Sequence, residues 1–597
     1  MKLIFIFIFS IFIHNNVFAT ASDNLVVNTS SGDVHGKKYK NIFIFEDIPY
    51  AKPPVGNLRW KAPRELDSPA IINPKDNNFC IQRPSNLGGA EGEGRIVGSE
   101  DCLYLDVFVP KKRSLKDLPV MFWIHGGGNT SGLKDLYDFS KFVARKDVIV
   151  VRLNYRLGPF GWFTHPAIQD FQEGDDKTSN FGTLDIIMAL KWVKKNISKF
   201  GGDENNVTIF GESAGGHNVL SLLVSKKAKG LFHKAISMSG YTTSISTNDA
   251  YLPQNVSSTS NFSSSKVVEK LYKNYSQKSQ NQIFDLKNIR KILLSLDAYD
   301  FFEPYAERDS YEEIPLLTAD GVVIPKVGLD TALSIKEYVN IVPTIAGSNR
   351  DEVKLWLATA RYFVDLEYSL IGSMLSIPKI KLSNESTFEA FNYYRSSAWQ
   401  IRGVSNPLKS LHKAGNNDLY AYRYDWDDHR RLVVADFKKL IGAAHASEIP
   451  ILIGDYDLVG GYPLSDLLYP PSFSKRYTSK NMMTFWTNFA KFGSPGRSTN
   501  SVLWEPYIYP EREQSILIID KKKNLRMKSD NVSFEFLKTK LKNDIRVNDL
   551  EKCVLLLQMF TYVGNDLYEK QIENYPNQCS RKDSENFIKD NASYIEY

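Results

Sequence analysis

Hydrophobic residues from about position 118 onward alternate between short apolar runs and longer segments with helical spacing. Residues 119–124 (PVMFWI) and 147–155 (DVIVVRLNY) have the length and β-branched content of buried strands. Residues 183–200 instead repeat apolar side chains at three- and four-residue spacing, which predicts an amphipathic helix ending at Gly201 and Gly202. The apolar positions of this helix are Ile186, Ile187, Leu190, Val193, Ile197 and Phe200.

The same alternation continues: the sequence predicts a strand at NVTIF (206–210), a helix over 215–225 and a strand within FHKAISMSG (232–240). Strand character returns at residues 340–347 and 418–426, after a Ser-, Asn- and Tyr-rich excursion over 241–312. This βαβ order predicts an α/β fold with a large, mostly parallel sheet covered by helices on both faces. No linker or repeat interrupts it, so we expect one domain over residues 22–597.

The first 21 residues have a different pattern. Lys2 precedes an apolar run over residues 3–13, and Ala19-Thr20-Ala21 has the small residues of a cleavage site. The run is too short to span a bilayer, so it predicts a signal peptide over 1–21, with an N-terminal anchor as the alternative. No later stretch is apolar for 18 residues. We therefore expect a secreted or periplasmic protein without a stable membrane span.

Composition narrows the functional classes. The chain has 597 residues, 43% of them hydrophobic and 24% charged, and a net charge of +6 without a long basic run, which argues against a nucleic-acid partner. Four cysteines in an exported chain suggest two disulfides in one of three pairings, of which the two local ones are simplest. No metal-binding spacing such as Cys-x-x-Cys or His-Glu-x-x-His occurs, so we expect no metal site. The four cysteines are Cys80, Cys102, Cys553 and Cys579.

The segment TIFGESAGGHNVL (208–220) places Ser213 between a strand and a helix. Gly-x-Ser-x-Gly alone is weak, because roughly one chain in five of this length contains it by chance. Here Gly211 and Gly215 supply the small neighbours that a tight strand-to-helix turn requires. Such a turn exposes the serine oxygen and aims the amides of the following helix at it, so we interpret it as a nucleophile elbow.

A nucleophilic serine also needs an oxyanion hole, a base and an acid. The glycines of WIHGGGNTSG (123–132) follow a buried strand, and the backbone amides of Gly127, Gly128 and Ala214 are the candidate donors. His445 lies in a loop of small residues and is the leading base. The acid follows the strand that ends near residue 347, and the residues themselves leave Asp351 and Glu352 as alternatives. The other histidines after the serine are His217, His233, His412 and His429.

With these motifs in order, the mature chain resembles the type-B carboxylesterase family, which includes cholinesterases. The resemblance covers nearly the whole mature chain and rests on FEDIPYAKPPVGNLRWKAP (45–63), SEDCLYLDVFVP (99–110), NYRLGPFGW (154–162), the elbow region, AGSNRDE (346–352), GAAHASEIP (442–450) and FWTNFAKFGSPG (485–496). It implies an α/β-hydrolase fold. The roles it implies are Ser213 as nucleophile, Glu352 as acid and His445 as base, Gly127, Gly128 and Ala214 as oxyanion donors, Glu212 and Ser239 as a second polar layer around the base, and a disulfide between Cys80 and Cys102.

The chain departs from the family pattern at several positions. Asn129 stands where the family often has an aromatic residue, Val353 where glycine is usual, and Asp185-Ile186 where Asp-Gln is usual. The tail from about residue 540 has no counterpart that the resemblance identifies, so we expect it to be a C-terminal extension of the family domain. None of these departures removes a catalytic group.

The resemblance implies hydrolysis of small-molecule carboxylic esters through an acyl-enzyme, without a cofactor. A triacylglycerol lipase is the alternative enzyme, and a non-catalytic adhesion homologue is the alternative class. The loop between Cys80 and Cys102 has no Trp, Tyr or Phe to bind a quaternary ammonium group, so we expect neutral esters rather than choline esters. Trp356 or Phe363 could supply an aromatic face from elsewhere in the chain. The sequence does not indicate the oligomeric state.

Overall fold

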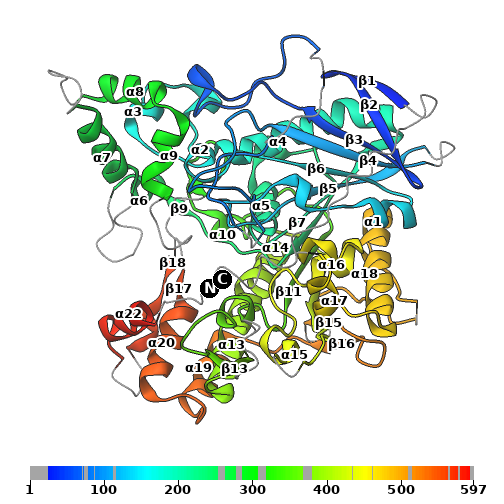
Figure 1. Ribbon diagram of the computed structural model, residues 1–597, viewed down its shortest axis with the longest axis vertical. Helices are drawn as coiled ribbons and strands as arrows, with labels where there is room; N and C mark the ends of the chain where they lie inside the picture. Colours follow the sequence, from blue (N-terminus) through cyan, green and yellow to red (C-terminus); the bar gives the residue numbers. More distant parts are fainter. Residues whose placement is uncertain are drawn as a thin grey trace.

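A computed structural model describes residues 25–69, 72, 78–85, 88–111, 116–252, 263–276, 285–306, 317–367, 379–432, 435–459, 461–499, 501–508, 514–562, 565–573, 575 and 579–591. The predicted signal peptide lies outside these residues. A twelve-stranded sheet runs through the described part in the order β1-β2-β3-β4-β6-β5-β7-β8-β11-β14-β15-β16 (Figure 1). The strands are β1 Leu25–Thr29, β2 Gly32–Tyr39, β3 Ile42–Pro49, β4 Tyr104–Pro110, β5 Leu118–Ile124, β6 Ile149–Leu153, β7 Gly202–Glu212, β8 Lys234–Met238, β11 Thr344–Asn349, β14 Leu419–Tyr424, β15 Ser515–Ile519 and β16 Arg526–Ser529.

The strands from β6 to β15 in this order pair in parallel, whereas β1 to β4, the β4–β6 pair and β16 are antiparallel. The prediction of a large, mostly parallel sheet is confirmed. Because parallel strands share their carboxyl edge, β5, β7, β8 and β11 all end at the same side of the sheet. The chemistry-bearing loops follow these four strands.

Strand β5 shows how the sequence buries both faces of the sheet. All of its residues are buried, and successive side chains enter different cores. Val120, Phe122 and Ile124 pack with the helices of one face, and Met121 and Trp123 pack with those of the other. This two-sided burial explains the continuous apolar run that a central parallel strand requires.

Helices cover both faces of the sheet. The first layer includes α4 Phe181–Asn196, α5 Ala214–Val224, α10 Leu329–Ala332 and α14 Asn406–Lys413, and the second includes α1 Ser140–Arg145, α16 Glu448–Ile453 and α18 Phe473–Phe492. The predicted helix over 183–200 corresponds to α4 followed by a 3₁₀ turn, Ile197–Phe200, whose C-cap is Gly201 at φ +88°. Further helices of the described part are α2 Gly158–Gly161, α3 Pro166–Gln169, α11 Lys354–Leu357, α13 Glu385–Gln400, α15 Phe437–Leu440 and α17 Leu464–Leu468.

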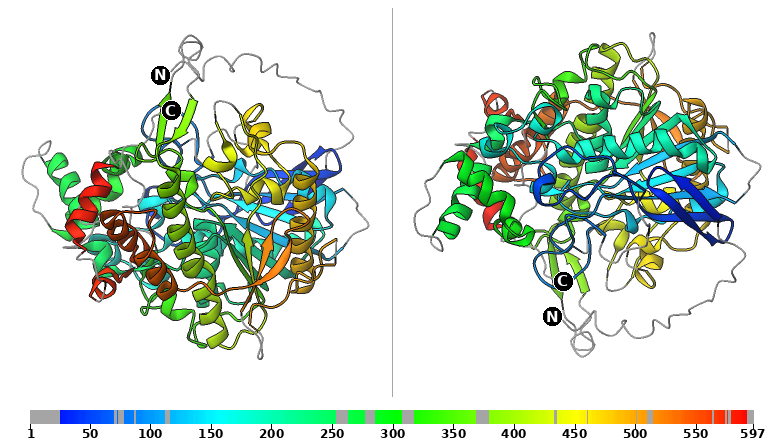
Figure 2. Two further views of the ribbon diagram at one scale, coloured as in Figure 1. Left: turned by 90° about the horizontal axis from the view of Figure 1, so that it is seen from below. Right: turned by 90° about the horizontal axis from the view of Figure 1, so that it is seen from above.

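Two smaller groups of helices lie on one side of the sheet, away from β1 and β2, in all three views (Figures 1 and 2). The Ser- and Asn-rich excursion forms the first group, and the tail beyond residue 540 forms the second together with the helix before it. The first group is α6 Thr247–Tyr251, α7 Ser264–Ser276, α8 Leu286–Ser295 and α9 Ala298–Ala306; the second is α19 Phe534–Lys542, α20 Asp549–Phe560, α21 Tyr568–Ile572 and α22 Arg581–Asp590. The described residues also form three short strand pairs: β9 Ile245–Ser246 with β10 Thr318–Ala319, β12 Val364–Glu367 with β13 Lys379–Leu382, and β17 Thr561–Tyr562 with β18 Asn565–Asp566.

Candidate active site

Ser213 occupies the turn between β7 and α5. Its backbone is left-handed, with φ +57° and ψ −121°, a conformation that costs a non-glycine residue energy. Gly215 is required one residue into the helix, because a Cβ atom there would overlap the carbonyl of Ile124. The side chain of Ser213 is half-buried, and its Oγ makes no hydrogen bond to another residue of the described part. The turn therefore presents an accessible, unpaired hydroxyl.

The glycine-rich loop after β5 lies beside this turn. Gly127 and Gly128 have φ angles of +95° and +63°, and a Cβ atom on Gly127 would overlap the carbonyl of Ser131. Their amides, and that of Ala214 at the start of α5, donate no hydrogen bond to any other described residue. Unsatisfied amides on a loop and at a helix N-terminus are suited to binding an anion.

His445 lies in the loop before α16 and contacts Glu352, which follows β11. The Nδ1 atom of His445 is 2.6 Å from Glu352 Oε2, and the other carboxylate oxygen accepts hydrogen bonds from Ser239 Oγ and the Asn349 amide, both at 2.7 Å. All of these groups are buried. Both oxygens of the Glu352 carboxylate thus have hydrogen-bond partners, and the contact with Nδ1 favours a proton on that nitrogen of His445.

Glu212 approaches the opposite nitrogen of the same ring. Its Oε1 lies 3.2 Å from His445 Nε2. Burial alone would lower the pKa of His445, but the carboxylates of Glu212 and Glu352 outweigh it and raise that pKa to about 9. Burial also raises the pKa of Glu212 to about 7, although the nearby His445 opposes this. The imidazole therefore rests between two carboxylates, with its Nε2 toward Glu212 rather than hydrogen bonded to Ser213.

A third buried carboxyl group, Glu448, belongs to this cluster and was not expected from the sequence. Its Oε2 accepts a hydrogen bond from Asn349 Nδ2 at 2.6 Å, and its Oε1 has no partner among the described residues. Burial raises its pKa to about 8, and Glu212 and Glu352 contribute further. Glu448 could have been found in the sequence from its place three residues after His445, where it begins an otherwise apolar helix.

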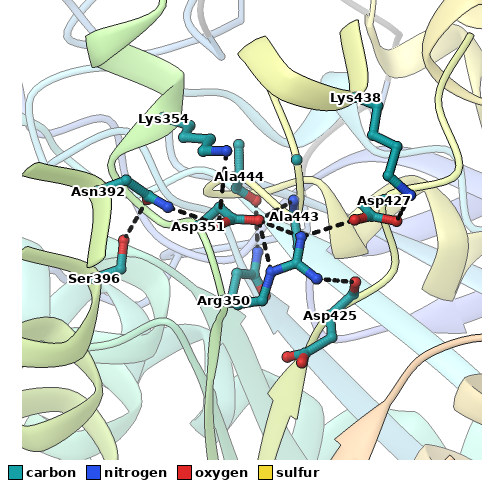
Figure 3. A network of polar contacts seen from close by, with 12 residues as sticks. Arg350, Asp351, Lys354, Asn392, Ser396, Asp425, Asp427, Lys438, Ala443 and Ala444 are labelled. Carbon is teal, nitrogen blue, oxygen red and sulfur yellow. Dashed lines mark hydrogen bonds and ion pairs between the residues drawn. The ribbon is translucent and has the colours of Figure 1, made fainter. Parts of the chain in front are cut away.

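Of the two acids that the sequence left open, only Glu352 reaches the imidazole. Asp351 points away, toward Arg350, and its oxygens accept hydrogen bonds from Asn392 Nδ2 at 2.7 Å and the Ala443 amide at 2.9 Å (Figure 3). Burial would raise the pKa of Asp351, but Arg350 and Lys354 outweigh it and hold that pKa below its ordinary value. Asp351 thus pins the loop that carries His445 to the end of β11.

Two tryptophans stack beside His445. Trp356 and Trp399 have ring centroids 6.0 Å apart and nearly parallel planes, and their centroids lie 5.2 Å and 4.9 Å from that of His445. Trp399 Nε1 donates a hydrogen bond to the Ser239 carbonyl at 3.1 Å. Phe363, the other aromatic residue considered from the sequence, packs instead against Phe391 in the core. An aromatic wall therefore adjoins the base, formed partly by Trp399, which no sequence motif indicated.

None of the other four histidines that follow Ser213 forms a hydrogen bond or ion pair with Glu352 in the described part, and three of them bond to other groups. His217 stacks on Tyr241 and contacts the Thr243 carbonyl, and His429 contacts the Gly442 and Leu468 carbonyls. The remaining two are His233, which accepts a hydrogen bond from the Val207 amide, and His412, which is exposed on α14.

Both local cysteine pairings are present as disulfides, Cys80–Cys102 and Cys553–Cys579. Within the described residues, no group of three or more His, Cys, Asp or Glu side chains has the arrangement of a metal site. In the same part of the chain, no helix combines the length and apolar character needed to cross a membrane.

Comparison with known proteins gives a family and several relatives. The family described as "Carboxylesterase family" matches residues 23–394 and 380–537. The chain is 33% identical over 512 residues to a para-nitrobenzyl esterase of Bacillus subtilis (strain 168), covering 82% of this chain and 94% of that protein. It is 31% identical to a liver carboxylesterase of Sus scrofa, covering 79% and 86% of the two chains.

Solved structures give the same relationship. A PNB esterase structure aligns with a TM-score of 0.61 and 28% identity, covering 86% of this chain and 99% of the other. A thermophilic PNB esterase aligns with a TM-score of 0.62 and 27% identity, covering 85% and 98%. The expected α/β-hydrolase fold is confirmed.

Proposed function

Since the chain belongs to the carboxylesterase family and is a carboxylic ester hydrolase, we propose that it works as a serine esterase with Ser213 as nucleophile, His445 as base and Glu352 as acid. One observation carries this assignment. A buried chain of hydrogen bonds runs from Ser239 through Glu352 to His445, and the His445 ring lies against Glu212, the residue before Ser213, whose hydroxyl has no partner among the described residues. An acid–imidazole pair beside an unpaired serine is the arrangement that activates a weak nucleophile.

In the acylation step, His445 accepts the Ser213 proton while Oγ attacks the ester carbonyl. The carbonyl oxygen becomes an oxyanion, and the amides of Gly127, Gly128 and Ala214 donate hydrogen bonds to it. His445 then gives its proton to the departing alcohol, leaving an acyl group on Ser213. Because His445 Nε2 rests near Glu212, the ring must shift toward Ser213 before proton transfer, as catalytic hydrogen bonds often tighten only with substrate bound.

In the deacylation step, His445 takes a proton from water while the water oxygen attacks the acyl carbonyl. The bond between the acyl carbon and Ser213 Oγ then breaks, His445 returns the proton to Oγ, and the carboxylic acid is released. Glu352 keeps the Nδ1 proton of His445 in place and stabilises the positive charge that the ring acquires in both steps. The nucleophile, the base, the acid and the oxyanion donors of these two steps all come from the chain, so the proposed reaction uses no cofactor.

We propose neutral, soluble carboxylic esters as the substrate class. The aromatic wall of Trp356 and Trp399 is suited to apolar acyl or alcohol groups. The relatives reported above are named as esterases, which favours soluble esters over the triacylglycerol emulsions of a lipase. The sequence predicted against choline esters because the loop between Cys80 and Cys102 has no aromatic residue. Two tryptophan faces lie beside His445 instead, and tryptophan faces can bind cations, so the preference between neutral and cationic esters must be measured.

Two experiments test the proposal. An organophosphonate probe should label wild-type protein stoichiometrically, and mass spectrometry should locate the label on Ser213; labelling of Ser213→Ala at the same stoichiometry would refute the nucleophile. For substrate class, acetylthiocholine is compared with its uncharged isostere 3,3-dimethylbutyl thioacetate. A tenfold or greater preference for the charged ester in kcat/KM, about 1.4 kcal/mol, would overturn the neutral-ester assignment.

A further inference from the structure

The loop that carries two of the proposed oxyanion donors has an unusual backbone. Gly127, Gly128 and Asn129 are consecutive, and all three have left-handed φ angles, of +95°, +63° and +58°. Asparagine is among the few non-glycine residues that tolerate this region. A glycine at position 129 would satisfy the same backbone conformation, so the conformation alone does not explain why the side chain is an asparagine.

That side chain is fully buried and joins the loop to the nucleophile helix. Asn218 Nδ2 on α5 donates a hydrogen bond to Asn129 Oδ1 at 2.8 Å, and Tyr155 Oη lies 3.3 Å from the same oxygen. Asn218 is also fully buried, five residues after Ser213. The Tyr155 hydroxyl in turn donates to the His125 carbonyl at 2.7 Å, just before the glycines. A pair of buried amides thus bridges two segments that are distant in the sequence.

The other tethers of this loop lead elsewhere. Gln82 pairs with Gly132 through two hydrogen bonds, Nε2 to the carbonyl at 3.0 Å and Oε1 from the amide at 2.9 Å, which fixes the loop to the segment after Cys80. The Asn129 carbonyl accepts a hydrogen bond from the Gly158 amide at 2.7 Å. Among the side-chain hydrogen bonds of the described residues, the Asn129–Asn218 bond alone connects residues 127–132 to α5.

We propose that Asn129 is a positioning residue of the oxyanion hole, whose bond to Asn218 sets the spacing between the loop amides and the Ala214 amide. This inference rests on the proposed function, in which one oxyanion receives hydrogen bonds from both segments. Those donors must lie 2.7–3.1 Å from a single oxygen atom, so a small displacement of the loop relative to α5 weakens all loop-side bonds together. In this chain the asparagine stands where the resembling family often has an aromatic residue, so the tether is a feature of this sequence.

The variant Asn129→Gly separates the tether from the backbone requirement. Glycine adopts the same φ at least as readily, so a purely conformational role predicts no loss of activity. The tether predicts a tenfold or greater fall in kcat with KM changed less than twofold. It also predicts that a trifluoromethyl ketone, which forms a tetrahedral adduct with the serine, binds at least tenfold more weakly, whereas a non-reacting ketone of the same shape binds as before.

Asn218→Ala removes the same bond from the other side and leaves the loop sequence intact. We expect it to lower kcat and ketone affinity to a similar degree, and the double variant to lose no more than the worse single variant. If Asn129→Gly does not fold, Asn218→Ala decides the question by the same measurements. Asn481→Ala is the matched control, because Asn481 is a buried asparagine on α18 that bonds to the Tyr477 carbonyl and the Thr499 amide; its kcat should stay at the wild-type value.

The outcomes are distinct from those that test the proposed function. If wild-type protein hydrolyses esters and Ser213→Ala does not, the function stands; wild-type kcat and ketone affinity in folded Asn218→Ala would then overturn the tether. Equal loss of activity in Asn481→Ala would also overturn it, since the effect would be one of general stability. Absence of esterase activity in the wild-type protein would instead overturn the proposed function.

Discussion

At the scale of single residues, the resting site holds its imidazole between two negative charges. His445 contacts Glu352 through Nδ1 and Glu212 through Nε2, at 2.6 Å and 3.2 Å. The proposed base must be neutral to accept the Ser213 proton, but the two carboxylates raise its pKa to about 9. Below that pH the ring is mostly protonated, so kcat/KM should rise with pH and level off above about 9.

Glu212→Gln should move this rise to lower pH. Among the electrostatic causes that raise the pKa of His445, Glu212 is the largest, so removing its charge lowers that pKa and frees the base at lower pH. The measurement is kcat/KM from pH 5 to 10 with an uncharged ester. Glu448→Gln is the comparison, and its shift should be smaller because Glu448 contributes least of the three carboxylates. An unchanged midpoint in Glu212→Gln would contradict the interpretation.

The neighbouring acids Asp351 and Glu352 should respond in opposite ways to amide substitution. Glu352→Gln keeps the shape but loses the charge beside the imidazole, so kcat should fall by up to about 10⁴-fold with little change in melting temperature. Asp351→Asn loses charge-assisted hydrogen bonds to Arg350 and the Ala443 amide, at about 2 kcal/mol of unfolding free energy, with a smaller loss of kcat. The reverse pattern would mean that the acid has been assigned to the wrong residue.

Sequence reasoning identified residues whose role depends on local backbone and missed those that depend on distant contacts. The Ser213 turn could be recognised because its neighbours must be small. Asp351 and Glu352 could not be distinguished, since consecutive residues after a strand differ only in where each side chain points. Trp399 belongs to another helix, and nothing in its local sequence indicates that it stacks beside His445.

At the scale of elements, periodicity predicted the central strands and α4, because both faces of the sheet are buried by regular patterns. It missed the helices α7 and α8 within the polar excursion over 241–312. Their apolar residues are interspersed with Lys, Asn and Ser, as in the sequence of α7, SSKVVEKLYKNYS. A narrow apolar stripe is enough here, because these helices pack in a small cluster around Phe301 and Trp60 rather than on the sheet.

The two disulfides allow a matched test of the loop that is closed by Cys80 and Cys102. They span 22 and 26 residues, so loop closure should stabilise the protein by about 3 kcal/mol in each case. Only the first encloses Gln82, whose side-chain amide pairs with Gly132 in the loop of the proposed oxyanion donors, residues 127–132, here called the oxyanion loop. Replacing either pair by serines should lower stability similarly, measured by denaturant midpoint.

The two variants should differ in catalysis. With folded protein at 25 °C, the Cys80→Ser/Cys102→Ser variant should lose kcat, because Gly132 is less firmly held, whereas Cys553→Ser/Cys579→Ser should keep it. Equal kcat in both variants would show that the first disulfide stabilises the chain without positioning the oxyanion loop.

At the scale of the whole molecule, the tail beyond residue 540 shares a core with the active-site side of the sheet. Leu541, Val554 and Leu556 belong to one buried cluster with Val353 and Leu357, which lie one and five residues after Glu352. Tyr362 also donates a hydrogen bond to Glu551 Oε1 at 2.6 Å. The sequence could not predict this packing, because the apolar run of α20 (residues 553–557) is buried without a motif that indicates what it packs against. The family match ends at residue 537, yet the tail packs beside the segment that follows Glu352, the proposed acid.

The prediction of one domain over 22–597 therefore becomes testable through α20. Leu556→Ala removes a fully buried side chain from the shared cluster and should lower the unfolding free energy by about 2–5 kcal/mol. Leu550→Ala, on the same helix but 41% exposed, is the control and should change stability by less than about 0.5 kcal/mol. If the tail and the sheet unfold together, calorimetry of Leu556→Ala gives a single transition at lower temperature, and esterase activity is lost over the same range. A separate early transition with activity retained beyond it would mean that the C-terminal helices form an independent unit, since the chemistry at Glu352 would then survive the loss of the core that packs against its loop.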